Sequence, residues 1–287
     1  MTDTLERPVD APTPAPRGPG ARALTWTGAI VGGVLLLSGA YSAIDLLVLG
    51  SGDATTTADR ASYAAAPVVE LVADGLITVT TGGDRVEVER SGRTALSTPV
   101  YQVDEIADRL RVSYRCDWWR PGYCSASLDV TVPDGTAVVV RAWDGSVTAT
   151  SLRGPLDVHT GDGATSVSDI VGDVSVRTSD GRTDISDVQG SVHAHASDGS
   201  IVVSDVSGAV TTRSSDGGTE ISGARGDIDA HASDGYVRVY GTGEPVALDI
   251  STADGGQTVE GPVDSTSSTH VRIRTSDGHA AYLGPRG

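Results

Sequence analysis

The sequence predicts an all-β chain, a single-domain β-solenoid of 18-residue coils preceded by one N-terminal transmembrane α-helix. Three observations support this prediction: a fixed repeat, apolar alternation within each repeat, and one long uncharged stretch near the start. Asp-Gly recurs with a spacing of 18 at positions 144, 162, 180, 198, 216 and 234. A second glycine keeps the same phase at Gly154, Gly172, Gly190, Gly208 and Gly226. A fixed period of this length is typical of stacked coils.

Two short strands are expected in every repeat. Counted from the Asp of Asp-Gly, apolar or β-branched residues alternate with polar ones, as at Val147 and Ala149, and a second alternating run follows the glycine, as at Leu156 and Val158. Alternation of this kind indicates strands with one buried face. A repeat of this length has a contour of roughly 60 Å, so it must close on itself if the next coil is to stack about 4.8 Å away. Each coil completes its core only against its neighbours, so stability rises with the number of coils.

Composition and charge exclude several classes of protein. The chain has 287 residues, among them 36 glycines and no phenylalanine, which argues against a thick globular core and fits a thin solenoid. Its net charge of −17 argues against nucleic acid or an anionic membrane surface as a partner. Cations, basic proteins of the envelope and neutral glycans remain as candidate partners.

The first part of the chain is expected to anchor it in a membrane. Residues 1–22 are rich in Pro and Ala and are expected to form a disordered cytoplasmic tail. Residues 23–49 form an apolar stretch long enough to cross the hydrocarbon core as a helix. Arg17 and Arg22 precede it whereas Asp53 and Asp59 follow it, so the N-terminus is expected in the cytoplasm and the rest outside. The alternative is a cleaved secretory signal, whose apolar region is normally shorter.

Three further segments complete the predicted organisation. Residues 50–67 are small and polar and are expected to form a linker. Residues 68–143 hold irregularly spaced strand candidates and are expected to form degenerate first coils and a cap. Residues 144–287 form the regular coils, which loosen after Gly235, since Asp254-Gly255 comes 20 residues later and Asp277-Gly278 a further 23. The last coils are therefore expected to carry small insertions.

The two cysteines, Cys116 and Cys124, flank a short loop that contains Pro-Gly. Outside the cytoplasm such a pair is expected to be oxidised, which predicts a disulfide-bonded hairpin. A metal site is the alternative, but two cysteines without a nearby histidine make a poor zinc signature.

These patterns resemble the DUF4097 domain, a family of bacterial envelope proteins often labelled "putative adhesin". The matching residues are the strand and turn from Leu128 to Gly135, the strand from Val138 to Val140, and the repeated Ser-Asp-Gly units. The resemblance covers about residue 68 to the end, and the first part looks like the actinobacterial anchored form. It implies a solenoid and, by analogy, adhesion; it supplies no catalytic residues.

The aspartates of Asp-Gly are expected to form a ladder of like charges on successive coils, which a cation would relieve. The calcium candidates are Asp162, Asp180, Asp198, Asp216 and Asp234. A second acidic ladder is expected at Asp169, Asp187 and Asp205. Against calcium, the ion needs six to eight converging oxygens, and Asp is also the ordinary turn residue before Gly.

A column of alternating His and Arg is expected on the outer surface, at a constant spacing after each Asp of Asp-Gly. Its members are His159, Arg177, His195, Arg213 and His231. One interpretation is that this column neutralises the acidic ladder. The other is a pH-sensitive binding stripe, because histidine changes charge near neutral pH.

Trp118, Trp119 and Tyr123 lie within the loop between the cysteines. They are expected either to cover one end of the solenoid as an apolar lid or to bind a protein or glycan.

The function expected from the sequence is that of a non-enzymatic, membrane-anchored envelope protein, single-pass and without a cofactor, that presents a rigid solenoid as an adhesive or interaction surface. The alternative is a self-assembling envelope scaffold or stress sensor, although a monomer is favoured over a polymer. A carbohydrate-active β-helix enzyme is disfavoured, because such enzymes place their acids beneath long loops that the regular coils lack.

Overall fold

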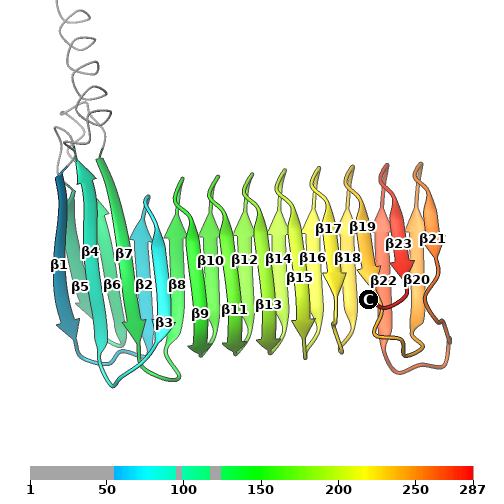
Figure 1. Ribbon diagram of the computed structural model, residues 1–287, viewed down its shortest axis with the longest axis horizontal. Coiled ribbons are helices and arrows are strands. Elements are labelled where there is room, and N and C mark those ends of the chain that lie inside the picture. The colour runs from blue at the N-terminus through cyan, green and yellow to red at the C-terminus, as the bar shows by residue number, and fades with distance from the viewer. Residues whose placement is uncertain (1–54, 95–98, 117–123, 287) are drawn as a thin grey trace, which may run out of the picture.

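The computed structural model describes residues 55–94, 99–116 and 124–286, and within these ranges the chain is all-β. Strands stack side by side into a long, flattened rod (Figure 1). Over the same ranges no helix has the length and hydropathy needed to span a membrane. The apolar segment at 23–49 lies outside them, so the predicted transmembrane helix stays a prediction.

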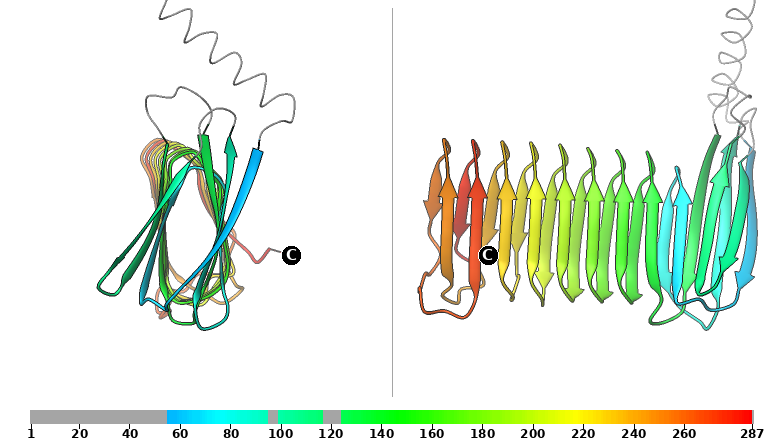
Figure 2. Two further views of the ribbon diagram at one scale, coloured as in Figure 1. Left: turned by 90° about the vertical axis from the view of Figure 1, so that its left-hand side faces the viewer. Right: turned by 180° about the vertical axis from the view of Figure 1, so that it is seen from behind.

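The described strands form two sheets that face each other across the core (Figure 2). In spatial order, sheet A contains β1 (Thr55–Tyr63), β4 (Val86–Thr94), β7 (Cys124–Val132), β3 (Ile77–Thr81), β9 (Val147–Arg153), β11 (Thr165–Val171), β13 (Thr183–Gln189), β15 (Ile201–Val206), β17 (Thr219–Ser222), β19 (Val237–Tyr240), β23 (Ala280–Leu283) and β21 (Gln257–Val259). Sheet B contains β20 (Ala247–Thr252), β22 (His270–Thr275), β18 (Ile228–Ala232), β16 (Val210–Ser214), β14 (Val192–Ala196), β12 (Val174–Thr178), β10 (Leu156–Thr160), β8 (Ala137–Ala142), β2 (Val68–Ala73), β6 (Arg109–Arg115) and β5 (Val100–Ile106).

The regular coils pair in parallel, each residue with its equivalent in the next repeat, as the fixed spacing predicts. Each coil contributes one strand to each sheet, so Thr165 of β11 pairs with Thr183 of β13, and Val174 of β12 pairs with Val192 of β14. The alternating positions predicted to point inward are buried, among them Ile185 and Val188, each 1% exposed. The predicted β-solenoid is therefore confirmed over these coils.

The start of the solenoid departs from a simple stack. Strands β2 and β3 form the coil next to the regular repeats, and β6 and β7 form the next coil outward. Beyond them, β4 and β1 extend sheet A in antiparallel fashion, and β5 does the same for sheet B. Residues 68–143 thus supply both first coils and a cap, but much of the cap is antiparallel rather than coiled.

The linker predicted at 50–67 is wrong for Thr55–Tyr63, which form β1. This strand pairs with β4 along its full length. Small and polar residues can form this strand because strand pairing uses backbone N–H and C=O groups and does not require large side chains. β1 is an edge strand, and polar residues are common at edges. The cap therefore begins before the predicted boundary at residue 68.

The end of the solenoid also differs from the prediction. The coil made by β22 and β23 pairs directly with the last regular coil, β18 and β19. The coil made by β20 and β21 comes earlier in the sequence but lies outermost, against β22 and β23. After β19 the chain thus forms the outermost coil first and then returns to form the coil between it and the last regular coil. The predicted insertions are present as longer connections, residues 241–246 between β19 and β20 and residues 260–269 between β21 and β22, but the exchange of coil order was not predicted.

Candidate interaction surface

The column of alternating His and Arg lies on the outer face of sheet B and is longer than the sequence analysis proposed. Consecutive members pair across neighbouring strands without a gap. In spatial order the row consists of Arg141, His159, Arg177, His195, Arg213, His231 and Arg274, and we call it the Arg/His row. All are exposed except His159, which is partly buried. The row runs across the strands and hence along the rod.

Two members of the row were missed by sequence analysis. Arg141 stands three residues before Asp144, and Arg274 stands three before Asp277, which is the same phase that His159 keeps before Asp162. Extending the rule to the irregular coils would have found both. The row ends at Ser251, which pairs with Arg274 in the outermost coil.

The Arg/His row forms ion pairs with acids in the neighbouring outward-facing column. Nε of Arg141 lies 3.0 Å from Oε1 of Glu70, and Nη2 of Arg274 lies 3.5 Å from Oδ2 of Asp249. Oδ1 of Asp157 lies 3.5 Å from Nδ1 of His159 and 3.9 Å from Nη1 of Arg177. The row members with an acidic partner are thus Arg141, His159 and Arg177 at one end and Arg274 at the other.

The middle of the row is free of such pairs. Among the described residues, no carboxylate lies within 4.0 Å of a side-chain nitrogen of His195, Arg213 or His231. Nor does any ion pair in the described ranges join the row to an aspartate of Asp-Gly. Direct pairing therefore does not support the interpretation that the row neutralises that ladder.

Glu70 is the most buried acid beside the row, with its side chain 8% exposed. Burial by itself would raise the pKa of the Glu70 carboxyl. Hydrogen bonds from Arg141 and Arg109, together with the charge of Arg111, outweigh this effect and lower the pKa. Glu70 thus stays charged and holds three arginines of the outer face of sheet B.

A shallow pocket of about 380 Å³ opens on the row beside Trp143. Its lining includes His159, Arg177 and His195. Trp143 is 71% exposed, which is unusual for so large an apolar side chain. Trp143 stands directly before the first Asp-Gly, in a phase that small residues such as Ser179 and Ser197 occupy in later coils. The sequence analysis missed it because that column otherwise carries no large side chain.

The aspartates of Asp-Gly lie at the exposed corner where each coil turns from sheet B to sheet A, and their backbone N–H groups continue the ladder between coils. For example, N of Asp198 donates to the carbonyl oxygen of Ser179 over 2.9 Å. Within the described ranges, no three His, Cys, Asp or Glu side chains converge in a way that could hold a metal ion. Calcium binding along this ladder stays a prediction without further structural support.

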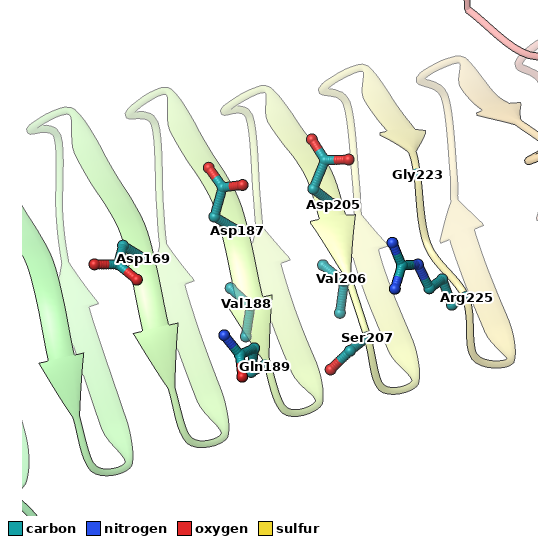
Figure 3. A pocket seen from close by; sticks show the side chains of 9 residues that line it. All are labelled: Asp169, Asp187, Val188, Gln189, Asp205, Val206, Ser207, Gly223 and Arg225. Carbon is teal, nitrogen blue, oxygen red and sulfur yellow. The ribbon is translucent and has the colours of Figure 1, made fainter.

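The second acidic ladder occupies a bend in sheet A. Asp169, Asp187 and Asp205 have φ of 53°, 54° and 54°, in the left-handed region, and Ser151 and Gly223 occupy the same column. Asp adopts this conformation more readily than most residues do, so the backbone itself favours Asp here. The ladder borders a groove of about 680 Å³ that also contains Gln189, Ser207 and Arg225, and Figure 3 shows the three carboxylates on successive coils.

The disulfide between Cys116 and Cys124 is confirmed, with the two Sγ atoms 2.00 Å apart. Trp118, Trp119 and Tyr123 lie outside the described residues, so neither interpretation of them is tested. Other aromatic residues pack against the core at this end of the solenoid, namely Tyr63, Tyr101 and Tyr114.

Arg90 holds this tyrosine cluster together. Its guanidinium carbon lies 5.8 Å from the ring centre of Tyr63 and 5.9 Å from that of Tyr101. The hydroxyl of Tyr101 donates to the carbonyl oxygen of Ser91 over 2.7 Å. Burial raises the pKa of Tyr101 to about 12, and burial and the charge of Asp74 also raise the pKa of Tyr114. Both phenols therefore stay neutral, as an apolar end cover requires.

Comparison with solved structures identifies similar folds. A "putative lipid binding protein" from Parabacteroides distasonis has a TM-score of 0.57 at 11% identity, over 80% of this chain and 97% of that one. A "putative adhesin" from Bacteroides fragilis has a TM-score of 0.49 at 14% identity, over the same shares of the two chains. At such identities the first likeness supports the fold alone.

Comparison with curated proteins gives no match. The family model described as Toastrack DUF4097 matches residues 78–282, which is most of the chain and nearly all of the solenoid. This match agrees with the resemblance drawn from the Ser-Asp-Gly units and from the strand and turn before Gly135. The chain belongs to the Toastrack DUF4097 family.

Proposed function

We propose that this chain is a non-enzymatic envelope protein that holds a rigid solenoid outside the membrane as an adhesive or interaction surface. Residues 23–49 would anchor it as a single pass, with residues 1–22 in the cytoplasm. The Arg/His row on sheet B would be the part of the surface that meets a partner.

One observation carries this proposal: an unbroken row of seven cationic or ionisable side chains crosses the outer face of sheet B in a chain of net charge −17. Repulsion between neighbouring like charges costs energy. Exposed ion pairs contribute little stability in return, and within the described ranges the middle of the row forms none. A row that does not serve the stability of the fold is best explained by binding.

The fold suits such a role. The coil strands of both sheets pair in parallel, repeat against repeat, and stack into a stiff rod, so a ligand that spans several coils meets side chains at fixed spacing. Pre-organised groups lose little conformational entropy when they bind. The disulfide and the tyrosine cluster stabilise the end of the rod nearest to the proposed anchor.

The proposal is tested in cells that express the full chain with an epitope tag at either end. Antibody should label the C-terminal tag on intact cells and the N-terminal tag only after permeabilisation. Attachment of these cells to envelope material from the same bacterium should fall several-fold in the double variant Arg177→Ala/Arg213→Ala. Labelling of the N-terminal tag on intact cells, or unchanged attachment, would contradict the proposal.

Self-assembly is the second candidate, and one observation favours it. Val259 and Val263, in and just after β21 of the outermost coil, are 47% and 50% exposed, so an apolar edge is available at that end. At the other end, β5 exposes Asp104 and Glu105, charges that oppose edge-to-edge pairing, beside the exposed apolar residues Val100 and Ile106. Light scattering of the full chain in detergent separates the two: a single-chain mass contradicts assembly, and a mass that grows with concentration supports it.

A further inference from the structure

We propose that the Arg/His row and Trp143 form a binding site for a linear acidic glycan that carries one carboxylate per disaccharide and lies along the rod. This inference rests on the proposed function and names the ligand of the same surface. Three features of the site support it: the direction of the row, its local charge and the exposed indole beside it.

The direction of the row fits an extended polymer. Its seven members lie on consecutive strands about 4.8 Å apart, so six steps span roughly 29 Å along the rod. Arginines occupy every second position from Arg141 to Arg213, which places them roughly 10 Å apart. An extended glycan of alternating 1,3- and 1,4-linked sugars repeats its disaccharide at about this interval. Successive carboxylates of such a chain could therefore meet successive guanidiniums, in competition with Glu70 at Arg141 and with Asp157 at Arg177.

The local charge of the row favours an anion despite the acidic chain. The Asp-Gly aspartates lie beyond the ends of the sheet B strands, and within the described ranges none forms an ion pair with the row. Within the described ranges, Arg213 has no carboxylate within 4.0 Å, so its guanidinium is available to form a bidentate pair with a ligand carboxylate.

Trp143 favours an acidic glycan over polyanions that contain no sugar ring. Its exposed indole lines the same pocket as His159, Arg177 and His195. An indole presents a flat apolar face and a polar edge, and the apolar face can pack on the C–H face of a sugar ring. Inorganic polyphosphate has no such face. Single-stranded nucleic acid does stack on aromatic rings, but its phosphates are packed more densely than the arginines of the row.

The test measures binding of the full chain in detergent to defined oligomers by isothermal titration calorimetry. A hyaluronan decasaccharide, which has one carboxylate per disaccharide, is the probe. A neutral chitin oligosaccharide, inorganic polyphosphate and oligo-dT are the comparison ligands. We expect the hyaluronan oligomer to bind at least ten-fold more tightly than each of the other three, with an affinity that falls as salt is added.

Variants of the row and of Trp143 test whether these residues form the binding site. Arg177→Ala/Arg213→Ala should weaken binding at least ten-fold, and Trp143→Ala should weaken it several-fold. The matched control is Arg182→Ala/Arg238→Ala, which removes the same charge from sheet A, where these arginines pair with Asp184 and Glu220. Melting curves followed by circular dichroism verify that each variant is folded. The control should bind like the unmodified chain.

Three results would overturn the inference. The first is equal affinity for polyphosphate or oligo-dT together with no effect of Trp143→Ala. The second is equal loss of affinity in the sheet A control. The third is no binding of the acidic oligomer. If any of these occurs while Arg177→Ala/Arg213→Ala still reduces cell attachment, the proposed function survives and only the ligand is wrong. If attachment is also unchanged, both fail.

Discussion

Gly199 lies against Gly181 of the preceding coil, so close that a Cβ atom added to Gly199 would stand 2.1 Å from the carbonyl oxygen of Gly181. The same contact recurs down the column of Asp-Gly glycines, which includes Gly163 and Gly217. Glycine therefore repeats in the sequence because, at this corner of the coil, the backbones of successive coils lie too close together for a Cβ atom. The neighbouring Asp is exposed and is under no such constraint.

We therefore predict that Gly199→Ala destabilises the solenoid by several kcal/mol or prevents folding, because the added Cβ would collide with backbone that cannot move away without separating two coils. The measurement is chemical unfolding followed by circular dichroism. Gly284→Ala is the control, since a Cβ there meets nothing within 4 Å. Similar stability of Gly199→Ala and the control would contradict this explanation of the repeat.

Thr183→Val should stabilise the chain. The hydroxyl of Thr183 is buried without a hydrogen-bond partner, and its neighbour in the column, Ile201, is apolar. Removing an unpaired buried hydroxyl while keeping the shape gains about 1–2 kcal/mol. The matched control is Thr178→Val, whose hydroxyl donates to the carbonyl oxygen of Gly161 over 3.2 Å, so the same change there should be neutral or destabilising. A rise in stability in both variants, or in neither, would refute this prediction.

Glu70→Gln should destabilise the first coils at pH 7 by about 1–3 kcal/mol, because it weakens charged hydrogen bonds to Arg109 and Arg141. Since these bonds lower the pKa of Glu70 when the chain is folded, their stabilisation is complete above the pKa of an unfolded glutamate, about 4.3. It is lost as the pH falls through the lower folded value. The difference in stability between the variant and the unmodified chain should therefore be present at pH 7 and shrink at pH 3, as unfolding curves at the two pH values would show.

Glu244→Gln serves as the control for this experiment, because Glu244 is exposed and forms no ion pair within the described ranges. It should leave stability unchanged at both pH values. A difference between Glu70→Gln and the unmodified chain that persists undiminished at pH 3 would show that packing, and not charge, explains the effect.

Binding to the Arg/His row should strengthen as the pH falls from 8 to 5.5, because protonated histidines add positive charge to it. Each histidine has two kinds of charged or ionisable neighbour. Across the strands, His159 lies between Arg141 and Arg177, His195 between Arg177 and Arg213, and His231 between Arg213 and Arg274. Two residues earlier on the same strand stand Asp157, His193 and Asp229, respectively. Exchange of all three histidines for Gln should leave affinity at pH 8 nearly unchanged and remove the rise at low pH. Titrations of the hyaluronan oligomer at both pH values measure this, and a persistent rise in the variant would exclude the row as its source.

Sequence alone predicts the regular coils well because every inward column repeats at a fixed spacing. Ile185 and Val203 occupy the same phase and are both buried, so one coil gives the pattern of the rest. The Arg/His row follows from the same rule, since it keeps a constant distance from Asp-Gly. The full length of the row needed only the extension of that phase to Arg141 and Arg274.

The ends could not be predicted in the same way. A period reports the length of a coil but not its position in space, so nothing in the spacing indicates that β22 inserts between β18 and β20. Likewise β1 is defined by antiparallel pairing to β4, a contact between two segments that follow no repeat. Trp143 occupies a phase that small residues such as Ser179 and Ser197 fill in later coils, so the repeat gives no sign of an aromatic side chain there.

The central claim is that the Arg/His row contacts the partner of this protein on the cell. Covalent labelling of histidines on intact cells that express the full chain, read by mass spectrometry, tests it most directly. His195 and His231, which are exposed in the row, should react several-fold less on cells than in the purified chain, whereas exposed His279 beside β23 of sheet A should react equally in both. Equal reactivity of the row histidines in the two samples, or protection of His279 alone, would contradict the account.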